Sequence, residues 1–272
     1  MATASLDNTA KIWSLETGEE QLTLRGHGDG VCGVEFLNKG KQVVTASLDK
    51  SLRIWTADSG ALLATLQGHQ NYLSCLAVSK DEQLLASGGF DNAVRVWSRE
   101  SASIYRAING FGGPVYAVAF SPDTKTLATG NEDQSLQLWD LGTGKTTRAF
   151  VGHSGPVESL AFAPNGASLA AGCGDQTARI WDAASGRLLV NMSSHAGVVK
   201  SVAFSPAGTL LATGGQDGTI RLWKAESSKE VARFEGHTNS VYDVTFAPDG
   251  KRMASASFDR TTKVWQLPTL TG

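Results

Sequence analysis

Residues 115–153 read VYAVAFSPDTKTLATGNEDQSLQLWDLGTGKTTRAFVGH. The first six residues are rich in β-branched and aromatic side chains and end at a Ser-Pro-Asp turn, which predicts a strand. Residues 126–130 predict a second strand, and residues 136–139, which alternate apolar and polar side chains, predict a third. After a glycine-containing turn, residues 147–151 predict a fourth strand before a Gly-His pair. The stretch therefore predicts four short strands joined by tight turns.

The same pattern recurs along the chain with a period of 42 residues. The seven tryptophans form one series: Trp13, Trp55, Trp97, Trp139, Trp181, Trp223 and Trp265. An aspartate stands six residues before each: Asp7, Asp49, Asp91, Asp133, Asp175, Asp217 and Asp259. All five histidines fall in a third series, His27, His69, His153, His195 and His237, and Phe111 occupies a further slot of it. Four strands per 42 residues are typical of one blade of a β-propeller.

The repeat resembles the WD-repeat family over nearly the whole chain. Gly-His pairs stand at residues 26–27, 68–69, 152–153 and 236–237, and the Trp-Asp dipeptide stands at 139–140 and 181–182. The resemblance implies an all-β fold with residues 1–272 as a single β-propeller domain. It also implies a hydrogen-bonded tetrad of histidine, turn aspartate, hydroxyl residue and tryptophan in a blade.

Four units carry every member of this tetrad. Their residues are His27, Asp49, Thr45 and Trp55; His69, Asp91, Ser87 and Trp97; His195, Asp217, Thr213 and Trp223; His237, Asp259, Ser255 and Trp265. Phe111 replaces the histidine of the unit that ends at Trp139, and Ala171 replaces the hydroxyl residue of the next. The first unit has no preceding histidine.

The ends of the chain fall inside the repeat. Residues 2–5 match a second strand and residues 262–265 match a third, which predicts 26 strands. We expect seven blades of four strands, except that the first lacks its inner strand and the last its outer strand. We also expect that a longer natural chain has lost its first roughly 30 residues. In the alternative, six blades form, residues 21–25 complete the last one and residues 1–13 make an extra hairpin. A buried Trp13 would favour seven blades and an exposed Trp13 six.

Composition excludes several classes of protein. The 24 Lys and Arg residues against 26 Asp and Glu give a net charge of −2, which argues against direct binding of nucleic acid or a membrane surface. No apolar run approaches the roughly 20 residues that span a bilayer. The three cysteines include no C-x-x-C pair and suit a reducing compartment. We expect a soluble protein of the cytoplasm, the nucleus or both, without a cofactor or a metal.

Catalysis is not expected. A histidine beside an aspartate and a hydroxyl resembles a catalytic triad, but here the trio recurs at fixed spacing, which suits a scaffold. The GTGKT segment at 142–146 lacks the upstream glycine of a phosphate-binding loop. In every unit but one, a basic residue stands two positions before the tryptophan, and Gln137 stands there in the remaining unit. We expect these basic side chains to form ion pairs or to be solvated. They are Lys11, Arg53, Arg95, Arg179, Arg221 and Lys263.

The family resemblance implies a binding surface around the central channel, called the top face here. Its residues lie three and five positions after the Gly-His histidine, and directly before the turn aspartate. The resemblance implies that Leu6, Leu48, Tyr72, Phe90, Tyr116, Tyr242 and Phe258 form an apolar arc on this face. Beside the arc, Glu132, Glu158 and Lys200 form a polar sector. Apolar patches of this kind often mark partner sites.

We therefore expect a non-catalytic scaffold that binds peptides or domains of other proteins as a subunit of a larger complex. The alternative is a recognition module for a basic or modified peptide side chain, held in an aromatic cage of Tyr72, Phe90 and Tyr116. The propeller is expected to be monomeric within its complex, and a dimer formed by exchanged strand edges stays open.

Overall fold

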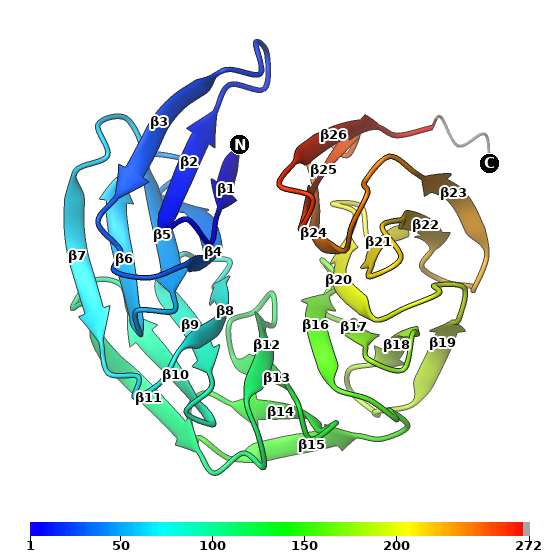
Figure 1. Cartoon of the computed structure of the whole chain (residues 1–272). Coiled ribbons are helices and arrows are strands. Elements are labelled where there is room, and N and C mark those ends of the chain that lie inside the picture. Colours follow the sequence, from blue (N-terminus) through cyan, green and yellow to red (C-terminus); the bar gives the residue numbers. More distant parts are fainter. Residues whose placement is uncertain (269–272) are drawn as a thin grey trace. The chain divides into compact units, whose positions relative to one another are not determined.

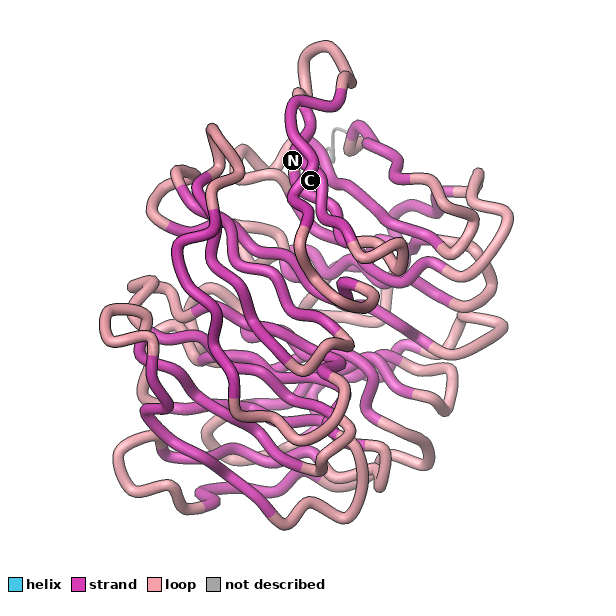
Figure 2. The backbone as a smooth tube through the Cα atoms, turned by 60° about the vertical axis from the view of Figure 1, so that its left-hand side comes forward, coloured by secondary structure: helices cyan, strands magenta, loops and turns pink. Residues whose placement is uncertain are grey.

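The computed structural model describes residues 1–268 and consists of strands joined by turns and loops, as Figure 2 shows in magenta and pink. These residues form 26 strands and no helix, the number of strands predicted from the repeat. No helix that is long and apolar enough to cross a membrane occurs in this part of the chain. The chain divides into two compact units, one of Met1–Asn131 with Trp139–Lys145, the other of Glu132–Leu138 with the chain from Thr146 onward.

The strands of the first half of the chain build three sheets and the inner part of a fourth (Figure 1). Their bounds are β1 (Ala2–Ala4), β2 (Thr9–Trp13), β3 (Glu20–Arg25), β4 (Val31–Leu37), β5 (Gln42–Ser47), β6 (Ser51–Thr56), β7 (Leu62–Gln67), β8 (Leu73–Val78), β9 (Leu84–Gly89), β10 (Ala93–Ser98), β11 (Ser103–Asn109), β12 (Val115–Phe120) and β13 (Thr126–Asn131).

The remaining strands complete the fourth sheet and build three more. Their bounds are β14 (Leu136–Asp140), β15 (Thr146–Phe150), β16 (Val157–Phe162), β17 (Ser168–Cys173), β18 (Ala178–Asp182), β19 (Leu188–Met192), β20 (Val199–Phe204), β21 (Leu210–Gly215), β22 (Ile220–Lys224), β23 (Glu230–Phe234), β24 (Val241–Phe246), β25 (Arg252–Ser257) and β26 (Thr262–Gln266).

Seven sheets result, and each is a propeller blade. Five have four strands in chain order, while β1-β2-β3 and β24-β25-β26 have three. The predicted all-β fold with seven blades is confirmed, including the missing inner strand of the first and the missing outer strand of the last. Trp13 is half-buried and so does not decide between seven and six blades. Strand pairing decides, because β3 pairs with β2 in the register Thr9↔Arg25 and so belongs to the first blade.

The turn aspartate fixes the hairpin between the second and third strands of every blade. The residue that follows it has a positive φ, from 55° at Asn92 to 72° at Asn8 and Lys50, and 76° at Gly218. The aspartate side chain spans this turn. Asp49 Oδ1, for example, accepts hydrogen bonds from the Ser51 amide at 3.0 Å and the Ser51 hydroxyl at 2.6 Å. Short polar side chains commonly close turns in this way.

The cores lie between neighbouring blades within each unit. In the first unit, Val44, Leu52 and Leu66 of one sheet pack with Leu73 and Leu85 of the next. In the second unit, one core joins β17–β20 with β21 and β22, and another joins β21 and β22 with β24 and β25. In the five four-stranded blades the second strand is buried on both faces, as Val43 and Val44 are, because these sheets are covered on both sides. Blades of this kind expose residues for binding mainly at the ends of their strands.

Candidate functional site

Four blades contain a chain of hydrogen bonds from an aspartate to a tryptophan. In the second blade His27 Nδ1 lies 2.8 Å from Asp49 Oδ2, His27 Nε2 lies 2.7 Å from Thr45 Oγ1, and Trp55 Nε1 donates to the same Oγ1 at 2.9 Å. The structure brings the other three sets of predicted tetrad residues together in the same way. They are His69, Asp91, Ser87 and Trp97; His195, Asp217, Thr213 and Trp223; His237, Asp259, Ser255 and Trp265.

The geometry assigns each proton in these tetrads. The aspartate accepts from Nδ1–H, so Nε2 of a neutral imidazole accepts from the hydroxyl, whose oxygen accepts from the indole N–H. Burial, the largest effect, and a nearby arginine lower the pKa of His27, His69 and His195 despite the adjacent aspartate, which favours the neutral ring. Burial would raise the pKa of Asp49, but hydrogen bonds from Ser51, Gly28 and His27 outweigh it and lower this pKa to about 2. The charge therefore stays on the aspartate.

Two blades keep only the last bond of this chain. Trp139 Nε1 donates to Thr129 Oγ1 at 3.0 Å, and Phe111 stacks edge-on against Trp139 with 5.5 Å between ring centroids. Trp13 Nε1 donates to Thr3 Oγ1 at 2.8 Å in the first blade. The aromatic ring of Phe111 thus replaces the histidine by packing alone.

The blade that ends at Trp181 has a different arrangement. His153 Nδ1 lies 3.3 Å from Cys173 Sγ, and the ring packs on Trp181 at 4.8 Å between centroids. Within residues 1–268 the buried His153 Nε2 has no hydrogen-bond partner, because Ala171 stands where other blades place a hydroxyl. Asp175 instead pairs with Arg179 at 2.7 Å. Burial, with the nearby Arg179 charge, lowers the pKa of His153 to about 4.

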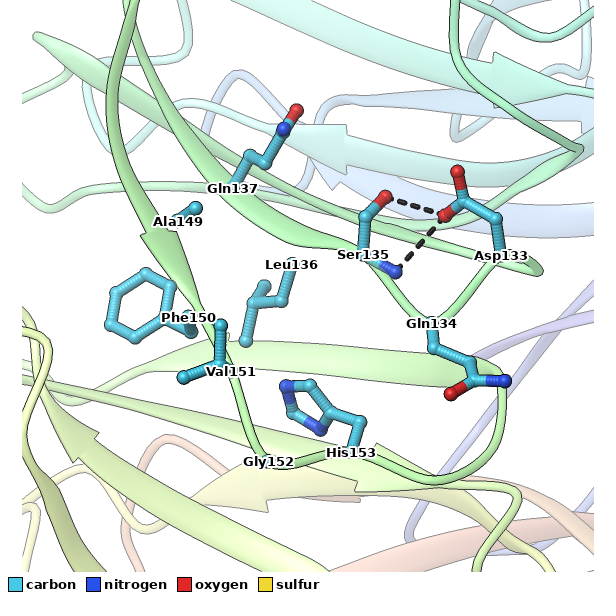
Figure 3. A pocket seen from close by; sticks show the side chains of 10 residues that line it. All are labelled: Asp133, Gln134, Ser135, Leu136, Gln137, Ala149, Phe150, Val151, Gly152 and His153. Carbon is cyan, nitrogen blue, oxygen red and sulfur yellow. Dashed lines mark hydrogen bonds between the residues drawn. The ribbon is translucent and has the colours of Figure 1, made fainter.

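A hollow of about 310 Å³ lies next to His153 in the second unit. Figure 3 shows the residues that line it, with His153 at one end and Ser135 bonded to Asp133 at the other. Leu136, Phe150 and Val151 form much of its wall. The hollow offers one imidazole with a depressed pKa, and burial raises the pKa of the adjacent Cys173 thiol to about 12, so this cysteine is not activated as a nucleophile. Over the described part of the chain, no group of three or more His, Cys, Asp or Glu side chains is placed to hold a metal ion.

The top-face residues of the first unit lie at one end of the sheets. First strands begin there and second strands end there, because the two are antiparallel. Leu6 and Leu48 close over Gly30, where an added Cβ would lie 2.9 Å from Leu6 Cδ2. Phe90 and Tyr116 contact each other with 6.0 Å between ring centroids.

Their exposure differs. Tyr72 and Phe90 expose 47% and 41% of their surface and Leu6 exposes 64%, whereas Leu48 and Tyr116 are half-buried. Phe90 is tied to Tyr72 by a backbone bond of 2.8 Å between its amide and the Tyr72 carbonyl. On two neighbouring blades, the rings of Phe90 and Tyr116 are thus in contact and Tyr72 is joined to Phe90 through the main chain; these three residues are called the aromatic cluster here.

The second unit holds the polar members and the remaining aromatic residues. Lys200 Nζ pairs with Glu158 Oε1 at 3.0 Å and lies 5.9 Å from the centre of the Tyr242 ring. Tyr242 and Phe258, both exposed, contact each other at 5.9 Å between centroids. Glu132 is exposed as well. The apolar arc requires Phe258 and Leu6 to lie close together, and this stays a prediction.

The basic residues before the apolar-Trp pair form ion pairs in five blades. Arg95 and Arg179 pair with the turn aspartates Asp91 and Asp175 at 3.0 and 2.7 Å, and Arg53 lies 3.9 Å from Asp49. Lys11 and Arg221 pair instead with the first residue of the outer strand. Lys263 has no ion pair within residues 1–268. Sequence reasoning did not identify which partner each of these residues takes.

The comparisons with known proteins find the repeat itself. The family model described as WD domain, G-beta repeat, matches residues 18–56, 60–98, 103–140, 144–182, 186–224 and 228–266. No curated protein sequence matches the chain. The matched stretches cover most of the chain, and each one contains the outer strand of one blade and the first three strands of the next.

Proposed function

The chain belongs to the WD-repeat family, and from this premise we propose that it is a non-catalytic scaffold that binds peptides or domains of other proteins on its top face. Propellers of this family are commonly protein-interaction scaffolds and are generally non-catalytic. To this general role of the family we add the top face as the binding surface and the residues on it that make contact. It also places the protein in the cytoplasm or nucleus, where its three free cysteines suit a reducing environment.

The aromatic cluster, with Tyr72 and Phe90 exposed and Tyr116 half-buried, carries the proposal. Large apolar side chains gathered on the surface often mark partner sites. Aromatic residues supply much of the binding energy at such sites. The rings of Phe90 and Tyr116 pack together, and the Phe90–Tyr72 backbone bond holds the two main-chain segments, which limits the conformational freedom lost on binding.

The buried tetrads support a structural role for the histidines. Four histidines are buried, and the hydroxyl that each contacts is at most 2% exposed. A nucleophile must reach its substrate, and these hydroxyls are bonded to both an imidazole and an indole. The repetition of one arrangement in four blades suits a role in holding the blades.

The test compares two double variants of the first unit by affinity purification and mass spectrometry. Phe90→Ala/Tyr116→Ala removes the aromatic cluster. Ile104→Ala/Tyr105→Ala removes exposed apolar residues of the outer strand β11 and serves as the matched control. We expect one set of partners to be lost with the first variant and kept with the second. Equal partner lists for both folded variants would exclude the cluster as the binding surface.

The second candidate is recognition of a basic or methylated side chain by the same cluster. The rings of Phe90 and Tyr116 are inclined by 59°, an arrangement that offers a cation more than one aromatic surface. Saturable binding of short Lys- or Arg-containing peptides, lost in Phe90→Ala/Tyr116→Ala, would support it. Flat titrations with such peptides would remove it while leaving the scaffold proposal standing.

A further inference from the structure

The lining of the hollow beside His153 carries a negative charge and no positive one. Asp133 lies at one end of the hollow and His153 at the other (Figure 3). The ten lining residues, all within residues 133–153, include no lysine or arginine. Burial, with the nearby Arg179 charge, lowers the pKa of His153 to about 4, so its ring is neutral at pH 7. A cation that enters the hollow therefore meets one carboxylate and no opposing charge among the lining residues.

Asp133 also lacks the basic partner that the turn aspartate of the next blade has. There Arg179, four residues after Asp175, donates to Asp175 Oδ2 at 2.7 Å. The corresponding residue after Asp133 is the uncharged Gln137, which lines the hollow. Within residues 1–268 the Asp133 carboxylate accepts hydrogen bonds from the Ser135 amide and hydroxyl through Oδ1, at 3.0 and 2.6 Å, and Oδ2 takes part in no bond. The carboxylate therefore keeps one oxygen available to a guanidinium from outside the chain.

The wall of the hollow is apolar. It is formed by Leu136, Phe150 and Val151. Leu136 and Phe150 are buried, whereas Val151 exposes 84% of its surface. The volume of about 310 Å³ has room for a long side chain. An alkyl stem, or an apolar residue next to it, would gain free energy by covering this wall.

The main chain at the rim of the hollow is open to approach. In two other Gly-His pairs the glycine packs on the tryptophan of the following blade, since an added Cβ would lie 3.2 Å from Trp97 Cη2 at Gly68 and 3.4 Å from Trp265 Cη2 at Gly236. A Cβ added at Gly152 would meet nothing within 4 Å. The space beside Gly152 therefore admits the main chain of another protein.

We propose that this hollow binds an arginine side chain of a partner protein, carried next to an apolar residue. The guanidinium pairs with Asp133 as Arg179 pairs with Asp175, and the apolar neighbour covers Val151. Arginine is favoured over lysine because its N–H groups match the two oxygens of a carboxylate. The hollow lies in the second unit and the aromatic cluster in the first, so this proposal stands or falls separately from the proposed function.

The probe is the capped tripeptide acetyl-Leu-Arg-Leu-amide, titrated into the 272-residue protein and followed by NMR. We expect saturable shifts of the backbone amides of residues 133–137 and 149–153. The same peptide with citrulline, which has the shape of arginine without its charge, should bind about fivefold more weakly, as expected for one partly exposed ion pair. Asp133→Asn should weaken the arginine peptide by the same factor, because it removes the charge and keeps Oδ1 for Ser135.

Gln137→Arg makes the test specific, because it supplies within the chain the guanidinium that the next blade has. This variant should lose saturable binding of the arginine peptide. Thr146→Arg adds the same charge at the opposite end of β15, where Thr146 is exposed, and is the matched control that should bind as the parent does. Phe90→Ala/Tyr116→Ala should also bind as the parent does, which separates the hollow from the aromatic cluster.

Four results would overturn the proposal. The first is the absence of saturable shifts at residues 133–137 and 149–153 up to about 10 mM peptide. The second is equal affinity for the arginine and citrulline peptides, since the hollow would then bind apolar groups without reading charge. The third is an equal loss of binding in Gln137→Arg and Thr146→Arg. The fourth is a dimer that forms with rising protein concentration and is abolished by Asp133→Asn, since a second copy would then fill the hollow.

Discussion

His153 contacts Cys173, with 3.3 Å between Nδ1 and Sγ, although the aspartate of its blade stands only two residues further along the chain. Asp175 is held by Arg179 at 2.7 Å and by the Thr177 hydroxyl at 2.5 Å. Because Ala171 offers no hydroxyl, His153 Nε2 has no partner among the described residues. This blade therefore buries a polar atom that the complete tetrads satisfy, and a buried atom without a hydrogen bond lowers stability.

Replacing Ala171 by serine should stabilise the protein. The other six blades hold threonine or serine in this position, and the hydroxyl of Thr213 lies 2.7 Å from His195 Nε2. One regained buried hydrogen bond contributes about 1 kcal/mol. We expect Ala171→Ser to raise the melting temperature by about 2–4 °C in differential scanning fluorimetry.

The neighbouring Ala170 is fully buried and provides the control. Ala170→Ser adds the same hydroxyl on the opposite face of β17, away from His153, and should lower the melting temperature. The prediction fails if the melting temperature rises for both variants or for neither, because the gain would then not come from a hydrogen bond between residue 171 and His153 Nε2.

Stability should fall as the pH falls below about 6.5, and His153 should contribute to this loss. Its pKa in the folded protein is about 4, below the ordinary value of 6.5. Between these values the unfolded chain binds a proton that the folded chain does not, so acid favours unfolding. One such group changes the free energy of unfolding by at most about 1.4 kcal/mol per pH unit. Above pH 6.5 its contribution is constant.

His153→Phe tests this contribution, because Phe111 already packs against Trp139 in the equivalent slot of the preceding blade. We expect the variant to gain stability relative to the parent protein as the pH is lowered from 7 to 4.5, as measured by chemical unfolding at each pH. Part of the slope will remain, since burial also lowers the pKa of His27, His69 and His195. Parallel curves for parent and variant would mean that His153 titrates normally in the folded state.

The fold could be predicted from the sequence because one period governs burial, turns and hydrogen bonds together. The tryptophans from Trp13 to Trp265 follow one another at intervals of 42 residues without an insertion. Once the strands of one unit are assigned, the same positions therefore give the strands of every other unit. The tetrad partners are set by backbone register in the same way. The pairing of β2 with β3 shows that the chain forms seven blades and not six, a choice that the half-buried Trp13 left open.

Contacts that depend on side-chain conformation could not be predicted in this way. Cys173 occupies a slot filled by Ser47, Gly89 and Gly215 elsewhere, so nothing in the repeat marks it as a partner of His153. Lys200 pairs with Glu158 of the neighbouring blade, and the repeat gives positions but not the direction of long side chains. The same holds for Arg221, which pairs with Glu230, while Arg179 pairs with its turn aspartate.

The tetrads predict unequal costs for the same substitution in two blades of the first unit. Thr45 accepts from Trp55 and bonds His27, whereas Thr129 accepts only the Trp139 indole bond, because Phe111 replaces the histidine. Both threonines are fully buried. Thr45→Val leaves two buried polar atoms without a partner and Thr129→Val leaves one, and each such atom costs about 1–3 kcal/mol.

We therefore expect Thr45→Val to lower the melting temperature clearly more than Thr129→Val, with the difference measured by scanning fluorimetry at pH 7.5. The steric change is the same in both variants, so it cancels in the comparison. Phe111→His offers a converse check, since it adds a histidine that can bond Thr129 and should make Thr129→Val more costly. If Thr45→Val and Thr129→Val are equally destabilising, the histidine bond contributes nothing measurable and the tetrads stabilise the blades through the tryptophan alone.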